Sequence, residues 1–264
     1  MPKKISDDLA NEALNLMGGG TLAYDTAGNN VCLTTDHPDG SAYTKVTGNG
    51  YADALVDTSY WGSPSGRQTR NSQEIAFPAV TGADPESSAV LWSVRGFAIE
   101  RSDGTTLYSA SLIQGQSLIH GDEYSFAAGD LAIDFNSTTK LGTALADAIA
   151  NATLRGQDIG VSPYFNLQFL ENAPAPNVAD VVLDITPIQI PADASNWLNS
   201  TARTTHNLLE LRTEVLTKDY EKIGGWQITT DEGDIWWQGA LSPAKYTIEG
   251  WELKVLPEGI VLEA

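Results

Sequence analysis

The chain contains an internal repeat. When the sequence is shifted by 129 positions, residues 96–135 align without a gap on residues 225–264. GFAIERSDGTTLYSASL then lies over GWQITTDEGDIWWQGAL, turn glycines coincide, and alternating apolar positions stay in phase. A slip of one residue would exchange the two faces of a strand. A shared phase over this length therefore indicates that the chain carries two copies of one module, the product of a tandem duplication.

The repeated module is predicted to be rich in β-strands. Between residues 21 and 135 the sequence consists of short apolar runs separated by Gly, Asn, Asp, Ser and Pro. Asp103-Gly104 is typical of a tight hairpin, and Gly129 interrupts an alternating pattern, which indicates a break or bulge. Runs spaced about 8–12 residues apart are typical of a β-sandwich or barrel. The predicted strands are NVCLTT, GYADALVD, QEIAFPAV, AVLWSVRGFAIE, TLYSASLI, EYSFA and LAIDF.

A helix is predicted at the start of each copy. Residues 5–17 have apolar side chains at helical spacing, with Ser6 as the capping residue and three glycines after the last turn. Residues 141–154 contain LADAIA, which resembles LANEAL in the first helix. We therefore expect an all-β fold with short helices, built as two tandem β-sandwich domains, each preceded by an N-terminal helix. The predicted domains are residues 1–138 and 139–264.

The middle of the second copy diverges from the first. YFNLQFLENAPAP predicts a strand followed by a proline-closed loop, as in NVCLTTDHPDG. VADVVLDITPIQIP predicts a strand pair, whereas NSTARTTHNLLELRTEVLTKD is compatible with either helix or strand.

Charge and composition exclude several classes of protein. The net charge of −19, from 15 basic and 34 acidic residues, would repel nucleic-acid phosphates. No apolar run approaches the roughly 20 residues of a membrane-spanning helix, and the first residues show no apolar signal segment. The single cysteine, Cys32, permits no disulfide framework within the chain. We expect no nucleic-acid partner, no membrane span and no secretion signal.

Catalytic and metal-binding patterns are weak. The three histidines (His37, His120 and His206) lie far apart, and turn-like sequence surrounds His37 and His120. We predict no metal site and no cofactor, with weak Ca²⁺ binding by the loop from Asp36 to Asp39 as an alternative. There is no Gly-x-Ser-x-Gly motif, and a Cys32 nucleophile would require an activating partner. The sequence therefore favours a protein that is not an enzyme.

Tryptophans mark the candidate interaction surface. Four of the seven lie within residues 226–251, and Trp236 and Trp237 are adjacent in a predicted strand. Adjacent strand residues face opposite sides, so one ring belongs to the core. The other lies against a partner, under a second internal layer such as the helix at 141–154, or in a glycan-binding platform. The candidate interface residues are Trp236, Trp237 and Trp251.

Six segments of the first copy, in order, support a family resemblance: DDLANEALNLM, VCLTTDHPDG, KVTGNGYADALV, QEIAFPAVTG, RGFAIERSDGTTLYSASL and HGDEYSFAAGDLAIDF. Across residues 5–135 they resemble a family of small phage virion proteins, often described as tail-fibre or minor tail proteins. The resemblance implies a small β-sandwich used as a structural or adaptor piece, and it carries over no catalytic residues. The second copy lacks the Gly-Tyr-Ala and Ala-Ala-Gly-Asp segments.

From this resemblance we expect a structural virion protein of a tailed bacteriophage. It would be a tail, fibre or baseplate subunit or adaptor, present in many copies and bound to other virion proteins. A duplicated module offers two similar surfaces on one chain, which suits an adaptor. One alternative is a capsid decoration or head-fibre protein. Another is a module that binds host glycan.

Overall fold

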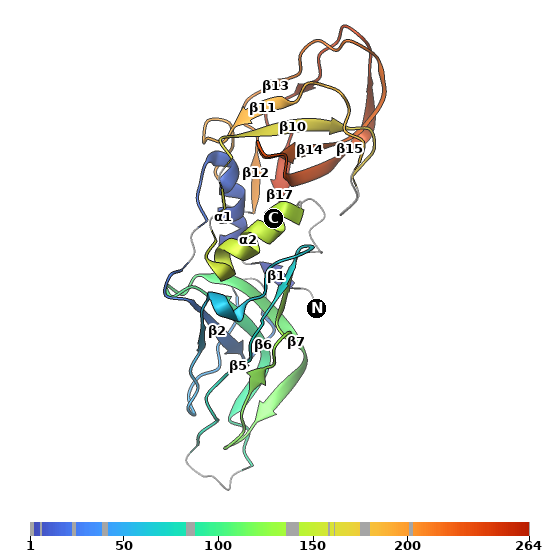
Figure 1. Ribbon diagram of the computed structural model, residues 1–264. Coiled ribbons are helices and arrows are strands. Elements are labelled where there is room, and N and C mark those ends of the chain that lie inside the picture. Colours follow the sequence, from blue (N-terminus) through green and yellow to red (C-terminus); the bar gives the residue numbers. More distant parts are fainter. Residues whose placement is uncertain are drawn as a thin grey trace. The chain divides into compact units, whose positions relative to one another are not determined.

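The computed structural model describes residues 3–5, 7–22, 25–38, 42–82, 88–135, 143–157, 159–160, 162–174, 180–200 and 203–263. The chain divides into two compact units: unit 1 comprises Met1–Ala10, Ala23–Ser137 and Ala150–Asp158, and unit 2 comprises Asn11–Leu22, Thr138–Ile149 and Ile159–Ala264. The fold is mostly β with two short α-helices, as the sequence predicts (Figure 1). The capping residue Ser6 and the predicted boundary between residues 138 and 139 lie outside the described residues.

Unit 1 is built on a five-stranded antiparallel sheet with the order β1-β7-β6-β2-β3. Its strands are β1 (Lys3–Ile5), β2 (Asn29–Thr34), β3 (Ala54–Val56), β6 (Trp92–Glu100) and β7 (Thr106–Leu118). The predicted Asp103-Gly104 hairpin joins β6 to β7: Gly104 has a φ of +86° and donates its N–H to the Arg101 carbonyl. Two further strand pairs complete the unit: β4 (Gln68–Arg70) with β9 (Ala132–Asp134), and β5 (Ile75–Ala76) with β8 (Ser125–Phe126).

Unit 2 is built on a four-stranded antiparallel sheet with the order β11-β10-β14-β15. Its strands are β10 (Tyr164–Leu170), β11 (Ile188–Pro191), β14 (Tyr220–Thr229) and β15 (Ile235–Thr247). Two pairs accompany it: β12 (Thr204–His206) with β17 (Val261–Glu263), and β13 (Leu211–Arg212) with β16 (Lys254–Val255). The segment that was compatible with helix or strand therefore forms the short strands β12 and β13.

Apart from β1, which has no counterpart in the four-stranded sheet, the two units repeat one topology. The order β3-β2-β6-β7 in unit 1 corresponds to β11-β10-β14-β15 in unit 2, and each small strand pair has its counterpart. The registers agree as well: Leu33 lies opposite Phe97, and Phe169 lies opposite Trp226. The later strands keep the predicted offset of 129 residues, whereas β2, β4 and β5 are offset by 136 from β10, β12 and β13, and β3 is offset by 134 from β11.

The contact made by the loop that follows β2 in unit 1 is repeated by the loop that follows β10 in unit 2. Gly96 of β6 lies so close to the proline-closed loop that a Cβ atom there would be 2.4 Å from Cδ of Pro38. Gly225 of β14 has the same relation to Pro174, at 2.5 Å. Overpacking a tight contact forces side chains or backbone to move. The absence of a side chain at both glycines therefore lets the loop close over the sheet in each unit.

The two helices are α1 (Asp7–Asn15), which continues into a 3₁₀ turn (Leu16–Gly18), and α2 (Thr143–Arg155). Each helix is divided between the units. Within unit 2, the Asn11 Oδ1 atom accepts hydrogen bonds from Ser200 and Arg203. Within unit 1, the Thr153 carbonyl accepts a bond of 2.9 Å from Asn29. Each unit thus includes a helical segment from the other half of the sequence.

Candidate interaction surface

The structure places the three candidate tryptophans in different environments. Trp236 is 3% exposed and Trp237 is 0% exposed, whereas Trp251 is 51% exposed. The ring of Trp236 packs against Phe165 with centroids 5.2 Å apart. Both faces of β15 are covered at this point, so neither ring of the adjacent pair is open to a partner. This corrects the expectation that one of the two is available for contact and leaves Trp251 as the candidate.

Exposed apolar side chains are concentrated in unit 2. Among the described residues, eleven of the fourteen large apolar side chains that are at least about a third exposed belong to it. Contiguous exposed apolar surface marks interaction sites more often than scattered single residues do. The eleven are Val181, Val182, Leu198, Leu208, Leu209, Val215, Tyr246, Ile248, Trp251, Leu256 and Val261.

Four of these residues form a group that we call the tip patch: Val215, Tyr246, Ile248 and Trp251. The Leu216 N–H donates to the Trp251 carbonyl at 2.8 Å, which places Val215 beside the turn that carries Trp251. Trp251 donates to the Ile248 carbonyl at 3.2 Å within that turn. Tyr246 and Ile248 flank the buried Thr247 at the end of β15, so they lie on one side of the chain.

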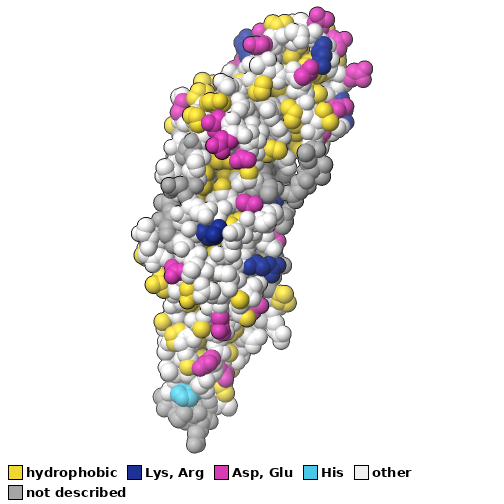
Figure 2. Space-filling model, in the orientation of Figure 1, with side chains coloured by type: hydrophobic (Ala, Val, Ile, Leu, Met, Phe, Trp, Pro, Cys, Tyr) yellow, Lys and Arg dark blue, Asp and Glu magenta, His cyan; other side chains and the backbone are white. Residues whose placement is uncertain are grey.

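Acidic groups border the tip patch. A carboxylate oxygen of Asp219 accepts the Glu249 N–H at 2.8 Å, and neither acid has a cationic partner among the described residues. Lys218 is neutralised by Asp184 at 2.8 Å. On the visible face of unit 2, acidic side chains lie among the apolar ones (Figure 2).

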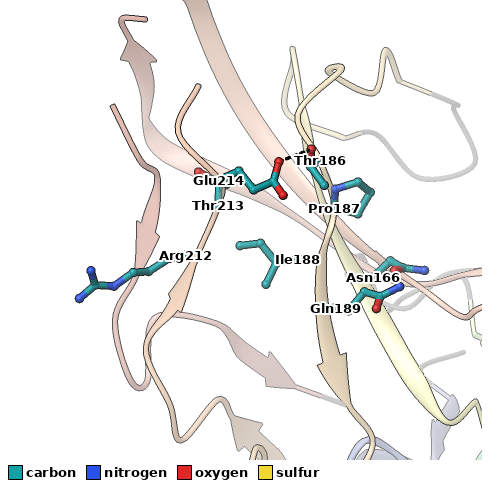
Figure 3. A pocket seen from close by; sticks show the side chains of 8 residues that line it. All are labelled: Asn166, Thr186, Pro187, Ile188, Gln189, Arg212, Thr213 and Glu214. Carbon is teal, nitrogen blue, oxygen red and sulfur yellow. Dashed lines mark hydrogen bonds between the residues drawn. The ribbon is translucent and has the colours of Figure 1, made fainter. Parts of the chain in front are cut away.

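Unit 2 also has a pocket of about 430 Å³ between β11 and the segment that follows β13 (Figure 3). Six of its eight lining residues have polar side chains, and those of Glu214 and Thr186 meet across it with oxygens 3.4 Å apart. The guanidinium of Arg212 points away from these groups (Figure 3) and contacts Glu252 at 3.8 Å. The full lining is Asn166, Thr186, Pro187, Ile188, Gln189, Arg212, Thr213 and Glu214.

Divergence between the copies accounts for this pocket. Thr213 donates its N–H to Leu253, as Phe77 does to Tyr124 in unit 1, so Thr213 and Phe77 are equivalent. Phe77 stacks against Tyr51 with ring centroids 6.3 Å apart. The second copy has threonine in place of phenylalanine and lacks the Gly-Tyr-Ala segment, which removes both rings. The pocket therefore has Thr213 where unit 1 has a ring, and its described lining brings together the Glu214 carboxylate and neutral polar side chains, with the Arg212 guanidinium turned away.

His120, in a turn, and His206, at the end of β12, have ordinary structural surroundings. His120 Nδ1 accepts the Gly82 N–H at 2.9 Å, and His206 lies 3.9 Å from Glu258. In the part of the chain that the structure describes, no three His, Cys, Asp or Glu side chains converge as a metal site would require. Both carboxylate oxygens of Asp36 accept the Thr44 N–H, and Asp39 lies outside the described residues. No helix in the described part is long and apolar enough to cross a membrane.

Cys32 lies in the interior of unit 1, with 0% exposure. Burial, reinforced by the charge of Glu100, raises the pKa of its thiol to about 12. A pKa that is higher in the folded state than in the unfolded chain contributes stability below the unfolded pKa, about 8.5. That stability is lost as the pH rises towards the folded pKa. Burial also raises the pKa of Tyr124 to about 12, with the same sign.

We therefore predict alkaline instability. The melting temperature should vary little between about pH 6 and 8 and fall steadily above about pH 9. Replacing Cys32 by alanine should make the decline between about pH 9 and 10.5 shallower, because one buried ionising group is removed. Calorimetric melting over this range tests both statements, and an identical pH profile for Cys32→Ala would contradict the role of the thiol.

The geometry describes a β-rich module whose second copy presents exposed apolar side chains. Residues 4–134 match the model of one protein family, described as podophage GP4 fiber I protein gp80. Residues 4–134 of the chain belong to this family of podophage fibre proteins. The matched region agrees with the resemblance predicted over residues 5–135. No curated protein matches the chain at a significant level.

The fibre family establishes the broad role of the chain. It is a structural protein of the phage virion and part of a fibre, and it associates with other virion proteins. The match covers the first copy only, so the tip patch and the pocket lie on the part of the fibre protein outside the family match. The family therefore does not assign either feature.

Sequence reasoning missed a second repeated signature in this fibre protein. DTSYW and RQTRN of the first copy recur as DASNW and RTTHN at the offset of 136. Asp57 accepts hydrogen bonds from the backbone and hydroxyl of Ser59, and Asp193 does the same for Ser195. The recurring Asp-x-Ser-x-Trp letters could have revealed it.

Proposed function

We propose that this fibre protein is a non-enzymatic tail, fibre or baseplate subunit that links neighbouring virion proteins through protein–protein interfaces. The observation that carries the proposal is the divergence of two copies of one module. The copies share topology, register and loop contacts but differ in exposed surface, with apolar side chains concentrated on the second. An enzyme would need reactive groups that converge on one site. Two copies of one fold with different exposed side chains can instead bind two different neighbours, as a connector must.

The glycan-binding alternative is weakened by the burial of Trp236 and Trp237. A sugar platform requires exposed aromatic faces, and of the tryptophans considered only Trp251 has substantial exposure. A capsid decoration protein and a fibre subunit would both bind other virion proteins through similar interfaces. The location of the chain in the particle is therefore what distinguishes the two roles.

The test is to locate and count the chain in purified particles. We expect quantitative mass spectrometry to find several copies per particle, and cryo-electron microscopy to place its density in the tail or a fibre, contacting at least one other virion protein. Density distributed over the capsid lattice would support the decoration role instead. Absence of the chain from mature particles, or hydrolytic activity on host-surface polysaccharide by the purified protein, would overturn the proposal.

A further inference from the structure

We propose that the tip patch (Val215, Tyr246, Ile248 and Trp251) is the docking site for another virion protein, whose docking face has an apolar recess bordered by lysine or arginine. The inference rests on the proposed connector function. It assigns a site that the family match does not cover and states the chemistry of the partner.

The duplication supplies an internal reference for each position in the patch. Val80 donates to Asp122 at 2.9 Å as Leu216 does to Trp251 at 2.8 Å, so Trp251 occupies the place of Asp122. The strand register places Tyr246 at the position of Ser117. Val215 likewise precedes Leu216 as Ala79 precedes Val80. Three small or polar residues of unit 1 are thus replaced in unit 2 by larger apolar or aromatic residues.

The fold does not require these larger side chains. In unit 1 the carboxylate of Asp122 accepts the Ile119 N–H at 2.8 Å and closes the same turn with a polar residue. In unit 2 the replacements remain largely exposed: Val215 by 56%, Tyr246 by 70% and Trp251 by 51%. Each therefore adds apolar surface in contact with water. Tyrosine and tryptophan are the residues that most often dominate the binding energy of protein interfaces.

Charge argues for a basic partner over a second copy of this chain. Residues 159–264 include 15 acidic and six basic residues. Beside the patch, Asp219 and Glu249 are held together without a described cationic partner. Lys245 directly precedes Tyr246 on β15, so the two side chains point to opposite sides of the strand. Lys218 is already paired with Asp184. Two tip patches brought face to face would place these acids against each other, whereas a partner with a basic rim would neutralise them.

The experiment uses the full chain and particles of the parent phage assembled without it. A triple variant, Val215→Ala, Tyr246→Ser and Trp251→Asp, gives each position the residue that unit 1 carries in the same backbone setting. The matched control is Ile113→Ser, which replaces an 89% exposed residue of unit 1 by the serine that unit 2 has at the equivalent position. Thermal melting first establishes that both proteins are folded.

We expect the triple variant to bind particles at least about tenfold more weakly than the wild type, because interface aromatics contribute most of the binding energy. Ile113→Ser should bind normally. Wild-type association should slow as NaCl is raised from about 50 to about 500 mM, and Asp219→Asn with Glu249→Gln should reduce that salt dependence.

Normal particle binding by the folded triple variant would overturn the tip patch while leaving the connector function intact. Failure of the wild type to bind particles would instead count against the proposed function itself. If the rate of wild-type binding to particles did not depend on NaCl concentration, the proposed lysine or arginine border on the partner would be wrong. Sedimentation showing a wild-type dimer that the triple variant abolishes would identify a second copy as the occupant and overturn the proposed partner.

Discussion

Replacing Asn71 by alanine should lower the free energy of unfolding of unit 1 by about 3–5 kcal/mol. Asn71 is 2% exposed and all of its side-chain hydrogen bonds go to backbone groups. Its Nδ2 donates to the carbonyls of Gln73 and Ala127, each at 2.8 Å. Its Oδ1 accepts the N–H groups of Gly129 and Leu131. Alanine would remove all four bonds at once. The Gly129 N–H and the Ala127 carbonyl keep backbone partners, whereas the buried Leu131 N–H loses its acceptor, so the loss exceeds that of a typical surface substitution.

Asn207 should behave in the same way because it does the same task in unit 2. It is 0% exposed, donates to Leu209 and Leu256, and accepts from Ile260. The two asparagines therefore hold the turn before the last strand in both units, although Ala-Ala-Gly-Asp occurs only in the first. A left-handed backbone is retained there as well, at Gly129 with a φ of +91° and at Glu258 with +62°.

Urea denaturation of Asn71→Ala and Asn207→Ala measures these losses. The matched control is Asn199→Ala, an exposed asparagine of unit 2, which should change stability by less than about 0.5 kcal/mol. Asn71→Asp separates the two halves of the network, because a carboxylate can accept from Gly129 and Leu131 but cannot donate to the two carbonyls. Losses below about 1 kcal/mol for both alanine variants would refute the assignment.

The part of the fold that could be predicted depends on local signals. The hairpins that contain Gly104 and Gly233 are recognisable because a turn residue and two alternating strands lie within about twenty positions. Both glycines have left-handed φ values, +86° and +93°. Because a slip of one residue would exchange the two faces of a strand, the alternating apolar positions of the two hairpins align only at an offset of 129 residues.

The earlier half of the repeat could not be aligned at the same offset. The second copy is seven residues shorter between the aligned early strands and β14. A single shift without gaps therefore aligns the later strands of the two copies and leaves the earlier strands unaligned. β12 and β13 illustrate the physical reason, because they are only three and two residues long and are specified by pairing with β17 and β16 far along the chain. Such pairing overrides local propensity.

The candidate surface shows the same limit. Alternation placed Trp236 and Trp237 on opposite faces of a strand, but alternation cannot say what covers each face. Trp251 was named as a candidate, yet its neighbour Val215 is 36 positions away and is brought beside it only by the bond between Leu216 and Trp251. The gap-free alignment of the two copies places Trp251 over Asp122, an aspartate in a turn of unit 1. The backbone bonds from Val80 to Asp122 and from Leu216 to Trp251 establish that the two positions are equivalent.

Glu100→Gln should destabilise unit 1 by about 2–4 kcal/mol, because it removes the buried carboxylate of an ion pair whose lysine is partly exposed. The Glu100 side chain is 7% exposed and accepts a hydrogen bond from Lys45 Nζ at 2.6 Å. Tyr43 donates to its other carboxylate oxygen. Burial opposes the charge of Lys45, but the hydrogen bonds to Glu100 and Asp53 outweigh it and hold the Lys45 pKa above its ordinary value. Removing the charge of Glu100 leaves the ammonium group with only Asp53 as its partner.

The second copy indicates how the pair can be replaced. Its equivalents of Glu100 and Lys45 are Thr229 and Val182, both uncharged. Losing both charges together should therefore cost less than losing one, as found for buried ion pairs elsewhere. In a double-mutant cycle, Glu100→Gln combined with Lys45→Met should be more stable than the sum of the single losses by about 1–3 kcal/mol. Lys218→Met, which breaks the exposed pair with Asp184, is the control and should cost less than about 1 kcal/mol. Strictly additive losses at Glu100 and Lys45 would show that the two side chains stabilise unit 1 independently.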